Sequence, residues 1–237
     1  MEAITDYLQA VHGASFQAGD VQWAQGTNSR ASLERALTNP AVHFVEVDVS
    51  LSESGEPIAA HPPESHSDLS IGDLLGRMAT THVGLKLDFK NEQVVRPVLE
   101  RFAESPLPQP VLLNADVLHV ARVPEPHVQA ERFIEQCQSL YPQGILSLGW
   151  RTRRTRGLVY SAENVQEMIA LTRDLETVTY PVRATMLHNS WHNVRRLLVA
   201  EGRTLTVWNT GPLHERGREW VRANTDPRRC FYATDIN

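Results

Sequence analysis

The sequence is poor in the features that identify a disulfide-stabilised or a membrane-spanning protein. Its 237 residues include only two cysteines, Cys137 and Cys230, which argues against a disulfide framework and favours two small, buried apolar side chains. No apolar run approaches the roughly 20 residues of a transmembrane helix, and the N-terminus lacks the basic-then-apolar pattern of a signal peptide. We therefore expect a cytoplasmic protein without a transmembrane segment.

An excess of positive charge is absent as well. The formal net charge of −5 gives no support for a general nucleic-acid binder. Four arginines are clustered locally, at Arg151, Arg153, Arg154 and Arg156. We interpret them as an exposed charged loop, with contact to a polyanion such as an RNA end as the alternative. Because no repeat, low-complexity stretch or linker interrupts the chain, we predict a single domain over residues 1–237.

Strand-like and helix-like hydrophobic patterns alternate along the chain. Strands are predicted at 20–24, 42–51, 82–89, 111–115, 144–148, 178–184, 204–208 and 230–233, with a short extra strand at 56–60. Helices are predicted at 3–12, 31–37, 71–78, 94–102, 128–140, 162–175, 190–200 and 214–223. This alternation indicates an α/β protein of the (β/α)₈ TIM-barrel class that lacks a helix after the last strand. We expect the N-terminal helical segment, 1–19, to pack on the barrel in its place.

Ionisable side chains gather at the predicted C-terminal ends of the strands, where barrel active sites lie. Glu46 and Asp48 point to one side of their strand, and two adjacent carboxylates repel each other unless a cation or proton lies between them. Asp88 and Lys90 follow the same spacing on a later strand, and His61 follows the short extra strand. A solvated strand face or a simple ion pair would explain either pair alone. The combination favours a hard divalent cation, Mg²⁺ or Ca²⁺, held by oxygen ligands.

Other strand ends supply candidates for substrate contact. A bound cation and basic side chains together would hold a phosphate, and the guanidinium fork of Arg183 suits one, although pairing with an acid is the alternative. Trp208 suits either the wall of a substrate pocket or core packing. The predicted substrate-binding residues are Asn28, Asn114, Trp150, Arg183 and Trp208. His61 is the predicted general acid or base, or the nucleophile.

Seven segments in order resemble the menorin family: WAQGTNSRASLERAL, FVEVDVSL, PIAAHPPESHSDLS, GLKLDFK, LSLGW, PVRA and LTVWN. A looser pattern resembles the glycerophosphodiester phosphodiesterases and the venom phospholipase D toxins: Gln25-x-x-Asn28, Glu46-x-Asp48, His61, Asp88-x-Lys90 and Trp208. The resemblance implies a barrel of the phospholipase-C-like phosphodiesterase type. It also implies Glu46, Asp48 and Asp88 as Mg²⁺ or Ca²⁺ ligands, Lys90 as a phosphate contact, and His61 as one of two catalytic histidines.

The other histidine is missing. The resemblance places it where this sequence has Gln25, and a glutamine amide can donate a hydrogen bond to a phosphate oxygen but cannot attack it or carry a proton at neutral pH. Three explanations stay open: an inactivating change (natural or engineered), a substitute group, or chemistry that needs one histidine and metal-activated water.

The predicted function is therefore metal-dependent phosphodiester hydrolysis or intramolecular transfer. The expected partner is a small phosphodiester substrate carrying a lipid, nucleotide or RNA-end phosphate. The alternative is a catalytically impaired barrel that binds a phosphate ligand or a protein.

Overall fold

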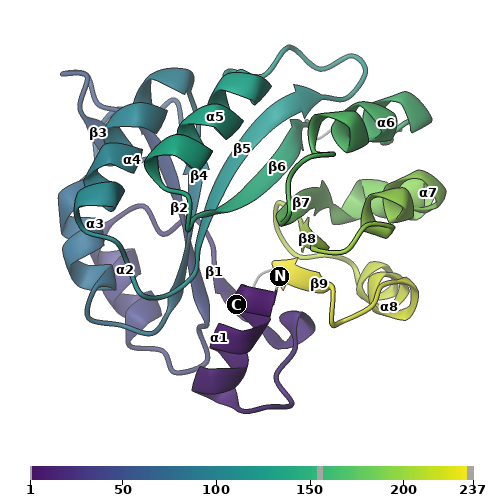
Figure 1. Cartoon of the computed structure of the whole chain (residues 1–237), viewed down its shortest axis with the longest axis horizontal. Coiled ribbons are helices and arrows are strands. Elements are labelled where there is room, and N and C mark those ends of the chain that lie inside the picture. The colour runs from purple at the N-terminus through teal and green to yellow at the C-terminus, as the bar shows by residue number, and fades with distance from the viewer. Residues whose placement is uncertain (1, 154–156, 234–237) are drawn as a thin grey trace. The chain divides into compact units, whose positions relative to one another are not determined.

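The chain follows the topology of a (β/α)₈ TIM barrel, as predicted. The computed structural model describes residues 2–153 and 157–233. Hydrogen bonds order the strands β1-β2-β4-β5-β6-β7-β8-β9 in one sheet, and β3 pairs with β2 outside this path. Helices alternate with these strands along the chain (Figure 1). The chain divides into two compact units, one formed by 22–115 and 127–146, the other by 1–21, 116–126 and 147–237.

The bounds of the elements are as follows. The strands are β1 (Trp23–Ala24), β2 (Phe44–Leu51), β3 (Pro57–Ala59), β4 (Gly84–Phe89), β5 (Val111–His119), β6 (Ile145–Arg151), β7 (Val178–Arg183), β8 (Arg203–Trp208) and β9 (Cys230–Ala233). The α-helices are α1 (Glu2–His12), α2 (Arg30–Leu37), α3 (Ile71–Met78), α4 (Val95–Glu104), α5 (Ala130–Leu140), α6 (Ala162–Leu171), α7 (Ala184–Val194) and α8 (Glu215–Asn224). Short 3₁₀ helices are η1 (Ala18–Asp20), η2 (Glu92–Val94) and η3 (Arg195–Leu198).

Several predicted bounds differ from the structure: β5 extends to His119, and α6 ends at Leu171. Two further differences have a local cause. The strand predicted at 20–24 is reduced to Trp23–Ala24, because Asp20 ends η1 and its carboxylate accepts the Gln17 N–H at 2.9 Å, and Val21 and Gln22 connect η1 to β1. The helix predicted at 190–200 begins at Ala184, directly after β7. Small residues such as Ala184 and Ser190 occupy buried positions of α7, and this hides its hydrophobic period.

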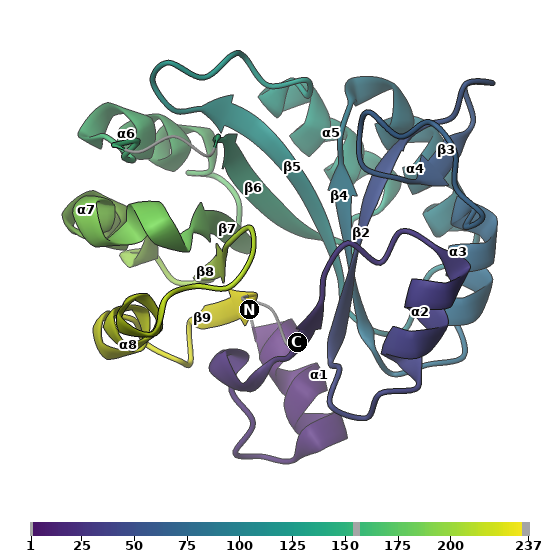
Figure 2. The ribbon, with the colours of Figure 1, turned by 180° about the vertical axis from the view of Figure 1, so that it is seen from behind.

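The unit formed by 22–115 and 127–146 contains parallel pairs of β1 with β2, β2 with β4, and β4 with β5. Strand β2 is buried at every position except its last, which is typical of a parallel strand covered on both faces. Helices α3, α4 and α5 lie along one flank of these strands in both views (Figures 1 and 2). Phe89 of β4 packs edge-on against Phe133 of α5, with ring centroids 5.6 Å apart.

The second unit contains the parallel pairs of β7 with β8 and β8 with β9. Helices α6, α7 and α8 lie side by side in both views (Figures 1 and 2). The N-terminal segment belongs to this unit, and η1 is joined to it by the Gly19 N–H, which donates to the Pro227 carbonyl at 2.7 Å. Both cysteines are free and buried, as expected. None of the described helices has the length and apolar character needed to span a bilayer.

Candidate functional site

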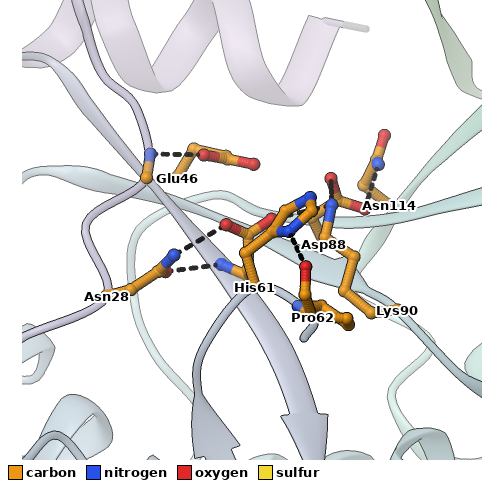
Figure 3. A network of polar contacts seen from close by, with 9 residues as sticks. Asn28, Glu46, His61, Pro62, Asp88, Lys90 and Asn114 are labelled. Carbon is orange, nitrogen blue, oxygen red and sulfur yellow. Dashed lines mark hydrogen bonds and ion pairs between the residues drawn. The ribbon is translucent and has the colours of Figure 1, made fainter. Parts of the chain in front are cut away.

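Three carboxylates from two neighbouring strands converge in the unit that contains β2 and β4. The strand register places Asp48 beside Asp88, and Glu46 lies two residues earlier on the same face of β2. Oxygen atoms of the three side chains lie within 4.8 Å of one another. Glu46 and Asp48 are buried and Asp88 is half-buried. The structure thus brings together the three acids that the sequence singled out (Figure 3).

The loop after β1 fixes Glu46 through its backbone. The Gly26 N–H donates to Glu46 Oε2 at 2.7 Å, and the Thr27 N–H donates to the Glu46 carbonyl at 2.8 Å. Gly26 has φ of +59°, a left-handed conformation that glycine adopts without the strain other residues would incur. The glycine therefore allows the loop to turn its N–H groups toward β2.

Two asparagines that the sequence suggested as substrate contacts hold the aspartates. Asn28 Nδ2 donates to Asp48 Oδ2 at 2.7 Å, and the Asp48 N–H donates back to Asn28 Oδ1 at 2.9 Å. Asn28 is available for this because Ser29, and not Asn28, caps α2. Asn114 of β5 donates in the same way to Asp88 Oδ1 at 2.8 Å. The structure therefore gives both amides a role in orienting carboxylates (Figure 3).

Lys90 lies between the two aspartates. Its ammonium nitrogen is 2.7 Å from Asp48 Oδ1 and 2.6 Å from Asp88 Oδ2. Burial acts to lower the pKa of Lys90, but the charges of Asp88, Asp48 and Glu46 outweigh it and raise the pKa above its ordinary value. The Asp88 carboxyl has its pKa lowered, because Lys90, Lys86 and the Asn114 amide together outweigh its burial. An ammonium group has three donors, so two of those of Lys90 are engaged here.

Lys86 is a member of this cluster that the predicted site leaves out. It is buried on β4 in register with Glu46, and its charge acts to lower the pKa of that carboxyl. The spacing Lys86-x-Asp88-x-Lys90 places all three side chains on one face of the strand. This spacing is the sequence pattern from which Lys86 could have been included in the predicted site.

The pKa of Glu46 shows the effect of burial beside two other carboxylates. Its pKa is raised from 4.5 to about 7, first by burial and then by the charges of Asp48 and Asp88, against the opposing effect of Lys86 and Lys90. A carboxyl in this state releases its proton when a cation binds beside it. The cluster is therefore short of positive charge even with two lysines present.

This pKa predicts how cation affinity depends on pH. Because one proton on Glu46 competes with the cation, we expect the Kd for Mg²⁺ or Ca²⁺ to fall about tenfold per pH unit up to about pH 7 and then level off. Isothermal titration calorimetry in buffers of different ionisation enthalpy would measure both the Kd and the proton release. A Kd that is constant between about pH 5.5 and 7 would contradict the expectation.

The same shift predicts the stability of the metal-free protein. Folding raises the pKa of Glu46, so the folded chain holds this proton more tightly than the unfolded chain does. The stability that this proton contributes is full below about pH 4.5 and is lost as the pH rises through about 7. Thermal unfolding in EDTA over this range, with Glu46→Gln as the variant that lacks the titration, provides the measurement.

His61 is connected to this cluster through the residue that precedes it. The N–H of the preceding residue, Ala60, donates to the Asp48 carbonyl at 3.0 Å. His61 Nδ1 lies 2.6 Å from the Pro62 carbonyl (Figure 3). Because a carbonyl only accepts, Nδ1 carries the hydrogen, and in the neutral ring Nε2 is left with the lone pair of a base. His61 is exposed, whereas Gln25, which directly precedes Gly26, is half-buried.

The remaining predicted site residues belong to the unit that contains β7 and β8. Arg183, at the end of β7, donates to Thr210 Oγ1 at 2.7 Å, and its guanidinium carbon lies 5.4 Å from the centre of the Trp208 ring. Trp150 is 1% exposed and packs on Tyr160, with ring centroids 5.0 Å apart. The Tyr160 hydroxyl accepts the Arg183 N–H at 2.8 Å. Tyr160 and Thr210, which had no distinguishing sequence pattern, thus hold the arginine.

Only part of the arginine cluster is described. Arg151 ends β6 and donates to the Glu125 carbonyl at 2.5 Å, and Arg153 is exposed. Arg154 and Arg156 lie outside the described residues. Of the two described arginines, Arg153 is the one that is exposed and follows β6, where the charged loop is predicted.

Comparisons with known proteins agree with the resemblance seen in the sequence. The family "Menorin N-terminal domain" matches residues 17–234. The human protein named Protein FAM151B is 34% identical over 227 residues, which cover 90% of this chain and 82% of the human protein.

Solved structures show lower similarity. The crystal structure of S. officinalis PLC21 has 12% identity and a TM-score of 0.40, covering 88% of this chain, and this chain spans 37% of that one. The 7,8-dihydropteroate synthase from Vibrio fischeri ES114 has 12% identity and a TM-score of 0.32, with 78% of each chain covered. The assignment therefore rests on the family match and the human relative: the chain belongs to the menorin family.

Proposed function

We propose that this chain is a divalent-metal-dependent phosphodiesterase that acts on a small phosphodiester. The observation that carries the proposal is the cluster itself, in which oxygens of Glu46, Asp48 and Asp88 lie within 4.8 Å of one another. Two lysines and the base nitrogen of a histidine supply the groups that phosphoryl transfer needs around such a cluster.

The residues present suit a hard cation. All three side-chain donors are carboxylates, which favours Mg²⁺ or Ca²⁺ over a metal that prefers nitrogen or sulfur ligands. The Gly26 N–H engages only Oε2 of Glu46, and each aspartate oxygen that accepts one hydrogen bond retains a second lone pair. Glu46, Asp48 and Asp88 would hold the ion, and Asn28 and Asn114 would orient two of these ligands.

The charge of the cluster favours a diester over a monoester. Three carboxylates and the two ammonium groups of Lys86 and Lys90 leave one net negative charge when all are ionised. A divalent cation would change this to one net positive charge, which a phosphodiester monoanion neutralises. A phosphomonoester dianion would leave the buried site negative again, at an electrostatic cost.

The side chains have separable roles in the proposed reaction. When bound, the cation would polarise a phosphoryl oxygen as a Lewis acid. Lys90 has a third N–H to donate to a phosphoryl oxygen while it bridges Asp48 and Asp88. His61 Nε2 would take the proton of the attacking hydroxyl or, once protonated, give it to the leaving oxygen. Attack by water gives hydrolysis, and attack by a hydroxyl of the substrate gives a cyclic phosphate.

The direct test is hydrolysis of bis(4-nitrophenyl) phosphate, a generic diester. We expect nitrophenolate release in Mg²⁺ or Ca²⁺, its loss in EDTA, and slower release from 4-nitrophenyl phosphate because of that substrate's second charge. Release that EDTA does not reduce would contradict the metal mechanism. Faster cleavage of the monoester would contradict the charge argument.

A second candidate function is a barrel that binds a phosphodiester without turning it over. Gln25, at the position where the resemblance places a catalytic histidine, favours it. So does the ammonium of Lys90, which already neutralises part of the charge of Asp48 and Asp88. Saturable binding of the diester in the presence of Mg²⁺, with no cleavage product formed, would identify this function.

A further inference from the structure

A cavity of about 400 Å³ lies in the unit that contains β7 and β8, among residues that the proposed reaction does not use. The last turns of α6, the segment at and after η3, and residues of β7 and β8 form its walls. Its volume lies within the range of about 300–1,000 Å³ that is common for small-molecule sites.

The wall of this cavity is largely apolar. Ile169 of α6 and Leu197 of η3 contribute to it, and Val199 and Ala200 follow η3. Val199 is 84% exposed, more than any other large hydrophobic residue in the described part of the chain. A single exposed valine is ordinary, but this one continues the apolar wall of a cavity outward to solvent.

Three arginines line the same cavity, and no aspartate or glutamate is among its described lining residues. Arg203 is only 5% exposed, and its guanidinium donates to three main-chain carbonyls, those of Thr172, Leu175 and Glu176, at 2.6–3.0 Å. These carbonyls follow α6, whose C-terminal end carries partial negative charge. The buried cation is therefore balanced by dipoles, and among the described residues it forms no ion pair with a carboxylate.

The two exposed arginines are also weakly compensated. Arg196 donates to the neutral Oε1 of Gln166 at 2.8 Å, and no described carboxylate forms an ion pair with it. The Arg173 guanidinium is 4.0 Å from Asp174, and both side chains are largely exposed, so this contact is worth little. Arg203 has a structural role, because it binds the carbonyls that follow α6. No comparable structural role explains why Arg173 and Arg196 lie at the mouth of an apolar cavity.

We propose that this cavity binds a free fatty carboxylate of medium chain length. Arg173 and Arg196 would hold the carboxylate, since guanidinium groups pair with carboxylates through two parallel hydrogen bonds. The hydrocarbon chain would cover Ile169, Leu197 and Val199, which removes exposed apolar surface from water. The charge of Arg203 beneath would add to the attraction without direct contact.

The test is calorimetric titration of the full chain with decanoate below its micelle concentration, in parallel with decyltrimethylammonium, which has the same chain and the opposite charge. Saturable decanoate binding is expected, with binding of the cationic amphiphile weaker by at least about tenfold. The double variant Arg173→Gln/Arg196→Gln should weaken decanoate binding by a similar factor. Ala200→Trp, which fills the cavity from an exposed position, should abolish it.

Arg216→Gln on α8 removes an exposed arginine away from the cavity lining and should leave decanoate binding unchanged. Equal binding of the two amphiphiles, or decanoate binding that survives both cavity variants, would overturn the proposal. So would binding to anionic phospholipid vesicles without any binding of free decanoate. Because none of these variants touches the carboxylate cluster, the outcome is independent of phosphodiesterase activity.

Discussion

Glu46→Gln is expected to remove Mg²⁺ or Ca²⁺ binding and to lower diester turnover by about 10³-fold or more, while the metal-free protein folds normally. Glutamine keeps an oxygen for the Gly26 N–H, so the contact between the loop and β2 survives. It also resembles the protonated carboxyl, which the raised pKa of Glu46 already makes common near neutral pH. The substitution therefore removes a metal ligand without leaving a buried charge unpaired.

At pH 8 the same variant should be as stable in EDTA as the parent chain, or more stable. Glu46 is mostly ionised there, and glutamine removes its repulsion with Asp48 and Asp88. Thermal unfolding and calorimetric titration with Mg²⁺ measure the two effects on one sample. Glu104→Gln, which neutralises an exposed acid of α4, is the matched control and should change neither. Retained cation affinity in Glu46→Gln would contradict the assignment of this carboxylate as a ligand.

The acids of the site were predictable because strand geometry alone decides which side chains share a face. Glu46 and Asp48 follow the alternation of β2, and Asp88 follows that of β4. Their convergence further requires that Asp48 pair with Asp88 in the strand register, which no local pattern determines. The fold class followed from the alternation of strand and helix patterns, which extends over the whole chain and tolerates errors in single elements.

The partners of these acids were not predictable, because they depend on contacts between distant segments. Nothing near Asn28 in the sequence shows that its amide engages Asp48 and not a ligand. An ion pair of Lys90 with Asp88 was an open alternative from their spacing, but the second contact of Lys90, with Asp48 on another strand, is known only from the structure. Trp150 was predicted to contact the substrate. Because both faces of a parallel strand are apolar, the sequence does not show on which face the ring of Trp150 lies, and the structure shows that the ring is buried.

Gln25→His is expected to raise diester turnover by about 10²–10⁴-fold, the usual contribution of a positioned acid–base group. Gln25 directly precedes Gly26, whose N–H is fixed on Glu46, so a histidine here would extend from a residue anchored beside the carboxylate cluster. His61 would supply the second imidazole. With one ring acting as base and the other as acid, the rate should show a bell-shaped pH dependence that the parent chain lacks.

Two variants separate a restored mechanism from an unrelated gain. Gln25→Asn, which cannot transfer a proton, should leave the parent rate unchanged. Gln25→His combined with His61→Asn should lose the gain, because the two rings act as a pair. If Gln25→His binds Mg²⁺ and diester as the parent does but turns over no faster, the histidine was not the missing group. The cluster of Glu46, Asp48 and Asp88 would then act as a binding site, and its lysines would serve to neutralise the bound phosphate and not a transition state.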